Sequence, residues 1–256
     1  MRKLTDILLG AMPFALLLLG WQWLSMFGGF PEKLVPDLAQ IASTFVRLAL
    51  EGILWDSAVA TVGRLLAGFF IAGAVGVFIG ILMGRNKSVE DLLLPLISFI
   101  YPIPGIAYAP LFVLWFGLGN LPAILLIAFV ATFPVAMNSW KGVTNIKRVW
   151  VRSAKVMGAS EQVIFRKIIL PGALPFILAG LRLGLAAAWR VLVAVEMLMS
   201  VKIGLGWMIF GSQTFLNTDV MLATIFLIGL IGVGLEKQVF ERIERYTVIR
   251  WGMVQA

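Results

Sequence analysis

Runs of about twenty apolar residues recur along the chain and constrain its fold more than any other feature. The first, Ile7–Phe27, contains 21 residues, enough to cross about 30 Å of hydrocarbon at roughly 1.5 Å per helical residue. A cleaved signal peptide would have a shorter apolar core, so we expect this segment to be retained. Five further spans follow, at Leu65–Met83, Leu92–Phe116, Leu121–Trp140, Gly172–Val195 and Val220–Val239. The sequence therefore predicts an all-α, polytopic membrane bundle of about six transmembrane helices, with residues 1–256 forming a single transmembrane domain.

The composition agrees with lipid as the solvent of this chain. Hydrophobic residues make up 61% of the 256 residues and charged residues only 13%, with a mean hydropathy of +0.98. A soluble domain needs more charged side chains to cover its surface. Cysteine and histidine are both absent, which excludes disulfides, thiol or imidazole metal sites and a histidine-dependent nucleophilic triad. We therefore expect neither a catalytic residue nor a metal site.

The basic residues are distributed unevenly between the two sides of the predicted membrane. With six spans and an inner N-terminus, fifteen of the 21 Lys and Arg residues fall in inner segments, whereas Lys33, Arg47 and Lys202 fall outside. Cytoplasmic loops of membrane proteins carry such an excess of positive charge. We therefore expect both termini and the Lys141–Pro171 loop to lie in the cytoplasm. The excess of Lys and Arg in the cytoplasmic segments then accounts for the net charge of +8. Nucleic-acid binding is not needed to explain this charge.

Two further patterns concern helices and their packing. Apolar residues recur at helical spacing after Pro36-Asp37, which predicts a short interfacial helix between the first two spans, and Met199–Asp219 is amphipathic with a turn at Gly204–Gly206. Small residues recur every four positions in the second and fifth spans, and such stripes let membrane helices approach closely. These residues are Gly68, Ala72, Gly76, Gly80 and Gly84 in the second span, and Gly180, Gly184 and Ala188 in the fifth.

The third predicted span is interrupted by prolines. Tyr101, Pro102 and Pro104 lie in its middle, with further prolines at positions 95 and 110. Each internal proline removes a backbone donor and frees a carbonyl one turn earlier. Broken backbone at membrane depth is tolerated where it is buried in protein or lines a cavity, and transporters place such breaks beside their substrate path. The pattern indicates either a substrate-lining segment or a kinked helix.

The inner loop Lys141–Pro171 contains the most specific pattern. Arg152-Ser153-Ala154 is followed by three residues, Gly158, nine residues and Ile168-Ile169-Leu170-Pro171. This resembles the EAA loop of binding-protein-dependent ABC importer permeases, in which Glu-Ala-Ala precedes the same spacing and the Ile-x-Leu-Pro ending. Arg152 stands where glutamate is usual, which puts in doubt any contact that depends on an acidic residue. Gly158 can end a short helix in the left-handed conformation, so that the helix can dock in a partner's groove; the alternative is a basic loop that serves only topology.

Other segments resemble the sulfonate, taurine and nitrate branch of this family, namely Tyr101–Pro104, Leu111–Gly117, Leu170–Pro175, Gly180–Arg182, Val195–Leu198 and Gly204–Gly206. The resemblance implies a type I ABC importer (MetI-like) permease fold in the cell inner membrane. It also implies a homodimer with two cytoplasmic ATPase subunits and a periplasmic or lipid-anchored substrate-binding protein. The residues that would couple the chain to its ATPase are Arg152, Ser153, Ala154, Gly158, Ala159, Ile168, Leu170 and Pro171. The chain contains no G-x-x-x-x-G-K-[ST] phosphate loop, so ATP and Mg²⁺ belong to the partner ATPase, and this chain has no cofactor and is not an enzyme.

The fifth span carries charged residues inside the predicted membrane. Arg182 lies about 16 Å above the inner boundary at Pro171, where an ionised group must face protein or water. Arg182, Trp189 and Glu196 share one helix face, with Arg190 on its flank. We expect these four residues, with the proline-broken segment, to line the translocation path, because a guanidinium binds oxyanions with paired hydrogen bonds. For both arginines a structural role, such as an interhelical ion pair, stays open.

The predicted function is the transmembrane subunit of an ATP-driven importer that moves a small solute across the inner membrane by alternating access. Sulfonates, taurine, nitrate and bicarbonate fit the resemblance, and aromatic carboxylates or a thiamine pyrimidine precursor stay open. The main alternative is a secondary transporter or channel without an ATPase partner, although the sequence shows no inverted repeat and no intramembrane acidic pair for ion coupling. A membrane-embedded enzyme is a further alternative, for which the sequence offers no site.

Overall fold

The computed structural model describes residues 2–199 and 201–236, with side chains from residue 12 onward. The regular structure of this part of the chain consists of helices, without a strand. The helices are α1 (Arg2–Phe27), α2 (Leu38–Leu50), α3 (Ile53–Arg85), α4 (Lys87–Ile100), the 3₁₀ helix η1 (Gly105–Tyr108), α5 (Ala109–Phe116), α6 (Asn120–Thr144), α7 (Arg148–Val156), α8 (Glu161–Ile164), the π-helical turn η2 (Phe165–Ile169), α9 (Leu170–Leu198), α10 (Leu205–Thr214) and α11 (Thr218–Gly234).

Three helical segments in the described chain are long and apolar enough to cross a membrane, and a bent pair supplies a fourth if it is counted as one broken span. The three are Ile53–Arg85, Asn120–Thr144 and the continuous helix Glu161–Leu198. The first and last predicted spans correspond to α1 and α11, whose apolar parts Met12–Phe27 and Thr218–Gly234 each contain fewer than 18 described residues. Val239, where the last span is predicted to end, lies outside the described residues. The all-α membrane fold is confirmed.

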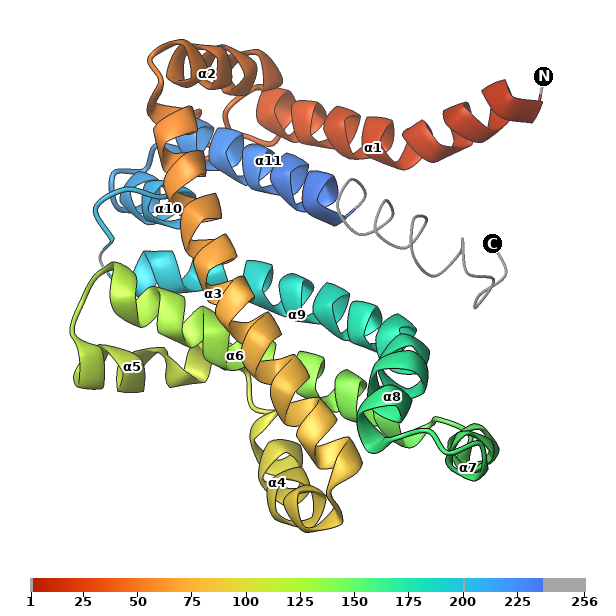
Figure 1. The fold of residues 1–256 in the computed structure, drawn as a ribbon. Coiled ribbons are helices and arrows are strands. Elements are labelled where there is room, and N and C mark those ends of the chain that lie inside the picture. Colours follow the sequence, from red (N-terminus) through yellow and green to blue (C-terminus); the bar gives the residue numbers. More distant parts are fainter. Residues whose placement is uncertain (1, 200, 237–256) are drawn as a thin grey trace.

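The centre of the bundle consists of α3, α6 and α9, and Figure 1 shows α3 crossing the other two. The stripe of small residues on α3 lies directly against α6. A Cβ added to Gly76 would lie 2.7 Å from the Cβ of Val135 and 2.9 Å from the carbonyl oxygen of Thr132. On α9, a Cβ on Gly184 would lie 3.1 Å from the carbonyl oxygen of Ala131. Both predicted stripes are therefore confirmed as sites of close helix contact.

The third predicted span is broken in the structure. Its first part is α4, and its second part, η1 with α5, is bent away from α4 by 96°. The break falls at Tyr101–Pro104, where two prolines remove backbone donors that a continuous helix would need. The chain passes from α4 to η1 here without a cis peptide bond. A bend of 96° is a break in the span rather than the kink of a continuous helix. The substrate-lining role of this segment stays a prediction.

The boundary of the second span differs from its prediction. The sequence placed the start at Leu65, but α3 begins at Ile53, directly after α2. The first turns of α3 carry the polar residues Ser57, Thr61 and Arg64, all of which are buried within the protein. A prediction from hydropathy excludes such polar residues from a span. Here contacts within the protein satisfy their polar groups. The span is therefore longer than its apolar stretch.

The predicted short helix between the first two spans is confirmed as α2. Its N-terminus is capped by Asp37, whose side chain accepts a hydrogen bond of 2.6 Å from the backbone N–H of Gln40. The hydroxyl of Thr44 donates a hydrogen bond of 2.7 Å to Asp219, which ties α2 to the start of α11. Figure 1 shows α2 and α10 at one end of the bundle and α7 at the other. The chain thus presents two distinct ends.

The contact between α3 and α6 can be tested with Gly76→Leu. The new side chain meets a backbone carbonyl that cannot move away. We therefore expect the free energy of unfolding to fall by roughly 1–3 kcal/mol, the effect typical of overpacking. The measurement is the thermal midpoint of the detergent-purified protein, followed by size-exclusion chromatography after heating. Gly63→Leu, on the same helix with open space around it, should leave the midpoint unchanged. Equal midpoints for both variants would show that the contact does not support the bundle.

Candidate functional site

A cavity of about 410 Å³ lies between the broken segment and α9. Tyr101, Pro102 and Pro104 form one wall, and Arg190 of α9 lies on the other. Val130 and Phe133 of α6 also contribute to the lining. Gly105 lets η1 approach both helices, since a Cβ there would lie 2.7 Å from Val130 and 3.2 Å from Val191. The structure thus brings together four of the residues that the sequence assigned to a translocation path.

Arg190 is the cation of this cavity. It is exposed, and within residues 12–199 and 201–236 it has no hydrogen-bond or ion-pair partner. A guanidinium presents five N–H donors in a plane, an arrangement that suits the oxygens of a carboxylate, sulfonate or phosphate. The remaining walls are mainly apolar and aromatic, which weakens competition from water. This geometry can hold a small oxyanion against Arg190.

A second cavity, of about 430 Å³, lies between α9 and α11. Arg190 also borders this cavity, together with Arg182 and Trp189. Arg182 forms an ion pair of 3.1 Å with Glu236, just beyond α11. Trp189 lies over Gly232, whose added Cβ would be 2.8 Å from the indole Nε1. The interhelical ion pair that the sequence left open for Arg182 is therefore present, and Arg190 lies between the two cavities.

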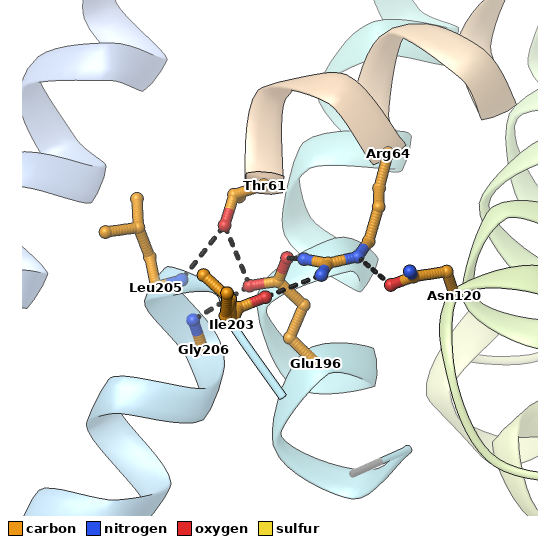
Figure 2. A network of polar contacts seen from close by, with 7 residues as sticks. All are labelled: Thr61, Arg64, Asn120, Glu196, Ile203, Leu205 and Gly206. Atoms are coloured by element: carbon orange, nitrogen blue, oxygen red, sulfur yellow. Dashed lines mark hydrogen bonds and ion pairs between the residues drawn. The ribbon is translucent and has the colours of Figure 1, made fainter. Parts of the chain in front are cut away.

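Glu196 lies in a separate polar network, shown in Figure 2. Its side chain is fully buried, forms an ion pair with Arg64 and accepts hydrogen bonds from the Thr61 hydroxyl at 3.0 Å and the Gly206 backbone N–H at 2.9 Å. Glu196 lines neither of the two cavities described above. It shares a helix with Arg190 but faces α3 and the start of α10.

Arg64 completes this network and was not among the predicted site residues. Its Nε donates a hydrogen bond of 2.7 Å to Asn120 at the start of α6, and another N–H donates to the carbonyl oxygen of Ile203. The Thr61 hydroxyl in turn accepts a hydrogen bond of 2.9 Å from the N–H of Leu205. The network joins α3, α6, α9 and the start of α10 (Figure 2). The sequence could have predicted this pair, because Arg and Glu residues within apolar membrane segments usually pair with one another.

The predicted coupling segment forms an exposed helix and a turn. Arg152, Ser153 and Ala154 lie on α7, which ends at Val156, and Gly158 follows in the left-handed region with φ of +80°. The N–H groups of Gly158 and Ala159 donate hydrogen bonds of 3.0 Å to the carbonyls of Lys155 and Ala154. This confirms the glycine-terminated helix that the sequence predicted.

Bulky apolar side chains of α7 and its C-terminal turn point into open space. Val156 and Met157 are 89% and 85% exposed, and Val149 and Trp150 are also exposed. Ile168 lies in η2, and Leu170 and Pro171 begin α9, so the segment leads directly into the longest span. An exposed helix with apolar side chains, held at the end of a span, can transmit the motion of a docked partner to the bundle.

Comparison with known proteins assigns this architecture to a family. Residues 76–236 match the family described as the inner membrane component of binding-protein-dependent transport systems. The chain is 37% identical to the taurine transport system permease protein of Escherichia coli K12 over 227 residues, covering 87% of this chain and 82% of that protein. It is 34% identical to a putative aliphatic sulfonates transport permease protein of Bacillus subtilis, covering 90% of this chain and 83% of that protein.

A solved structure shares the fold. The MetNI methionine ABC transporter, in an inward-facing conformation, matches with a TM-score of 0.66 at 20% sequence identity, covering 78% of this chain and 98% of that one. The type I importer fold is thereby confirmed. The family match and the related permeases replace the alternative of a secondary transporter or channel with an ABC importer subunit. This chain belongs to the family of inner membrane components of binding-protein-dependent transport systems and is the permease subunit of an ABC importer.

Proposed function

We propose that this permease imports a small oxyanion of the sulfonate type and that Arg190 contacts this substrate during its passage. The exposed guanidinium in a cavity walled by the broken segment carries the proposal. The relatives named for taurine and for aliphatic sulfonates support it, because a sulfonate offers three oxygens to paired N–H donors. Nitrate and bicarbonate are smaller oxyanions that the same donors suit.

We further propose that two copies of the chain form the permease in the inner membrane of the cell. Each copy is a single transmembrane domain with both termini in the cytoplasm. Two ATPase subunits bind the exposed α7 segments and supply ATP and Mg²⁺, and a substrate-binding protein docks at the opposite end. Transport then proceeds by alternating access, in which the cavity beside Arg190 opens to each side in turn. The separation of α7 from α2 and α10 (Figure 1) supports this arrangement.

The role of Arg190 can be tested with Arg190→Gln in the reconstituted complex. We expect at least about tenfold slower transport, since one charge-assisted pair contributes roughly 1.5–3 kcal/mol, with assembly and basal ATP hydrolysis maintained. Arg190→Lys should recover part of the rate, because an ammonium keeps the charge but loses the paired donors. The wild-type complex, prepared in parallel, is the reference. Native transport by a well-assembled Arg190→Gln complex would exclude the proposed contact.

The coupling role of the α7 segment can be tested with Gly158→Trp. A tryptophan strains the left-handed backbone and adds bulk where the partner would dock. We expect normal membrane insertion but loss of most substrate-stimulated ATP hydrolysis. Gly63→Trp provides the control for added bulk, because Gly63 also has open space around it but lies within α3, away from the α7 segment. If both variants hydrolyse ATP equally under stimulation, α7 is not the coupling element.

The proposed orientation can be tested by labelling single cysteines, since the chain contains none. A cysteine introduced at Ser160, beside α7, should react with an impermeant maleimide only after the membrane is opened. A cysteine at Ser43, on α2, should react in spheroplasts with an intact inner membrane. The reverse pattern would refute the orientation inferred from the distribution of basic residues.

A further inference from the structure

A cavity of about 560 Å³ lies at the α7 end of the molecule, between α7 and the connection from α3 to α4. Five basic side chains line it, together with the carboxylates Glu90 and Glu161. The basic residues are Arg85, Lys87, Arg148, Arg152 and Lys155. Neither the proposed substrate path nor a coupling role requires so many cations to gather in one cavity.

The lysines of this cavity are neutralised and the arginines are not. Lys87 forms an ion pair of 2.9 Å with Glu90, and Lys155 forms one of 2.6 Å with Glu161. Among the described residues, none of the three arginines has a carboxylate within ion-pair distance. The cavity therefore carries a surplus of three guanidinium groups, the side chain best suited to bind the oxygens of a phosphate.

An apolar groove of about 480 Å³ continues from this cavity along the last turns of α3. Phe78, Ile81 and Leu82 line it, with Phe165 on the opposite side. Arg85 borders both the groove and the basic cavity, and its guanidinium lies 4.9 Å from the centroid of the Phe165 ring. Phe78 is 67% exposed on a helix that crosses the membrane. The cations therefore adjoin a hydrocarbon-lined surface.

This juxtaposition has the chemistry of an amphiphile with an anionic head. We propose that the basic cavity binds the phosphate headgroup of an anionic phospholipid whose acyl chain lies along the Phe78–Leu82 groove. The site rests on the proposed orientation, which places this end of the molecule at the cytoplasmic leaflet, where anionic lipids attract basic residues. A soluble phosphate would account for the arginines but leaves the apolar groove without a role. The lipid would brace the α3–α4 connection against α7, the segment that the ATPase engages.

The experiment is native mass spectrometry of the full-length chain in detergent, titrated with phosphatidylglycerol or with phosphatidylcholine of the same acyl chains. We expect one phosphatidylglycerol to be retained at concentrations where phosphatidylcholine is not. Arg85→Gln should weaken phosphatidylglycerol binding about fivefold, the effect of roughly one juxtamembrane charge. Arg148→Gln, on the other wall, provides a second variant should the first fail to fold. Arg166→Gln, an exposed neighbour that lines neither cavity nor groove, is the matched control and should bind as the wild type does.

Three results would overturn the proposal. Equal retention of the two lipids by the wild-type chain would show that no headgroup is recognised. Undiminished binding by both variants would place the lipid elsewhere. Binding of inorganic phosphate that depends on Arg85, without retention of phosphatidylglycerol, would identify a soluble anion as the ligand. The assay measures neither transport nor ATP hydrolysis, so its outcome is independent of whether Arg190 contacts the imported substrate.

Discussion

The close approach of α3, α6 and α9 is the contact on which the rest of this structure depends. Lipid chains are as apolar as leucine side chains, so hydrophobicity does not draw these helices together, and van der Waals contact between their backbones must do so. Gly76 and Gly184 bring α3 and α9 against the same turns of α6, where both helices meet the side chain of Val135. This arrangement holds α6 against both helices, which also contact each other. It also places Val130 and Phe133 of α6 opposite Arg190, which creates the cavity beside the broken segment.

Two arginines illustrate how surroundings set the role of a charge inside a membrane protein. Arg64 has a buried carboxyl partner in Glu196 and further acceptors in Asn120 and Ile203, so its desolvation is offset by well-formed contacts. Arg190 has neither kind of partner among the described side chains and faces a cavity. The first arginine holds the connection between α9 and α10 against α3. The second is available to an anion.

The segment proposed to couple the chain to its ATPase combines an ordered backbone with exposed apolar side chains. Its helix ends at a left-handed glycine with defined hydrogen bonds, so the backbone is well specified. Its apolar side chains are nevertheless open to solvent, which is costly unless a partner covers them. Arg152 of α7 also borders the basic cavity between α7 and the α3–α4 connection. The segment therefore combines an outward apolar surface with an inward cationic one.

The sequence by itself determined the features that depend on local pattern. The apolar runs predicted the helices, the small-residue stripes predicted their packing faces, and Gly158 predicted the turn after α7. Tertiary structure alone decided which charges meet. Arg64 and Glu196 are 132 positions apart, and their pairing follows from the packing of α3 against α9. The same packing explains why α3 begins at Ile53 and not at the predicted Leu65. Thr61 and Arg64 are buried in protein contacts, and polar residues with such contacts are tolerated within a span.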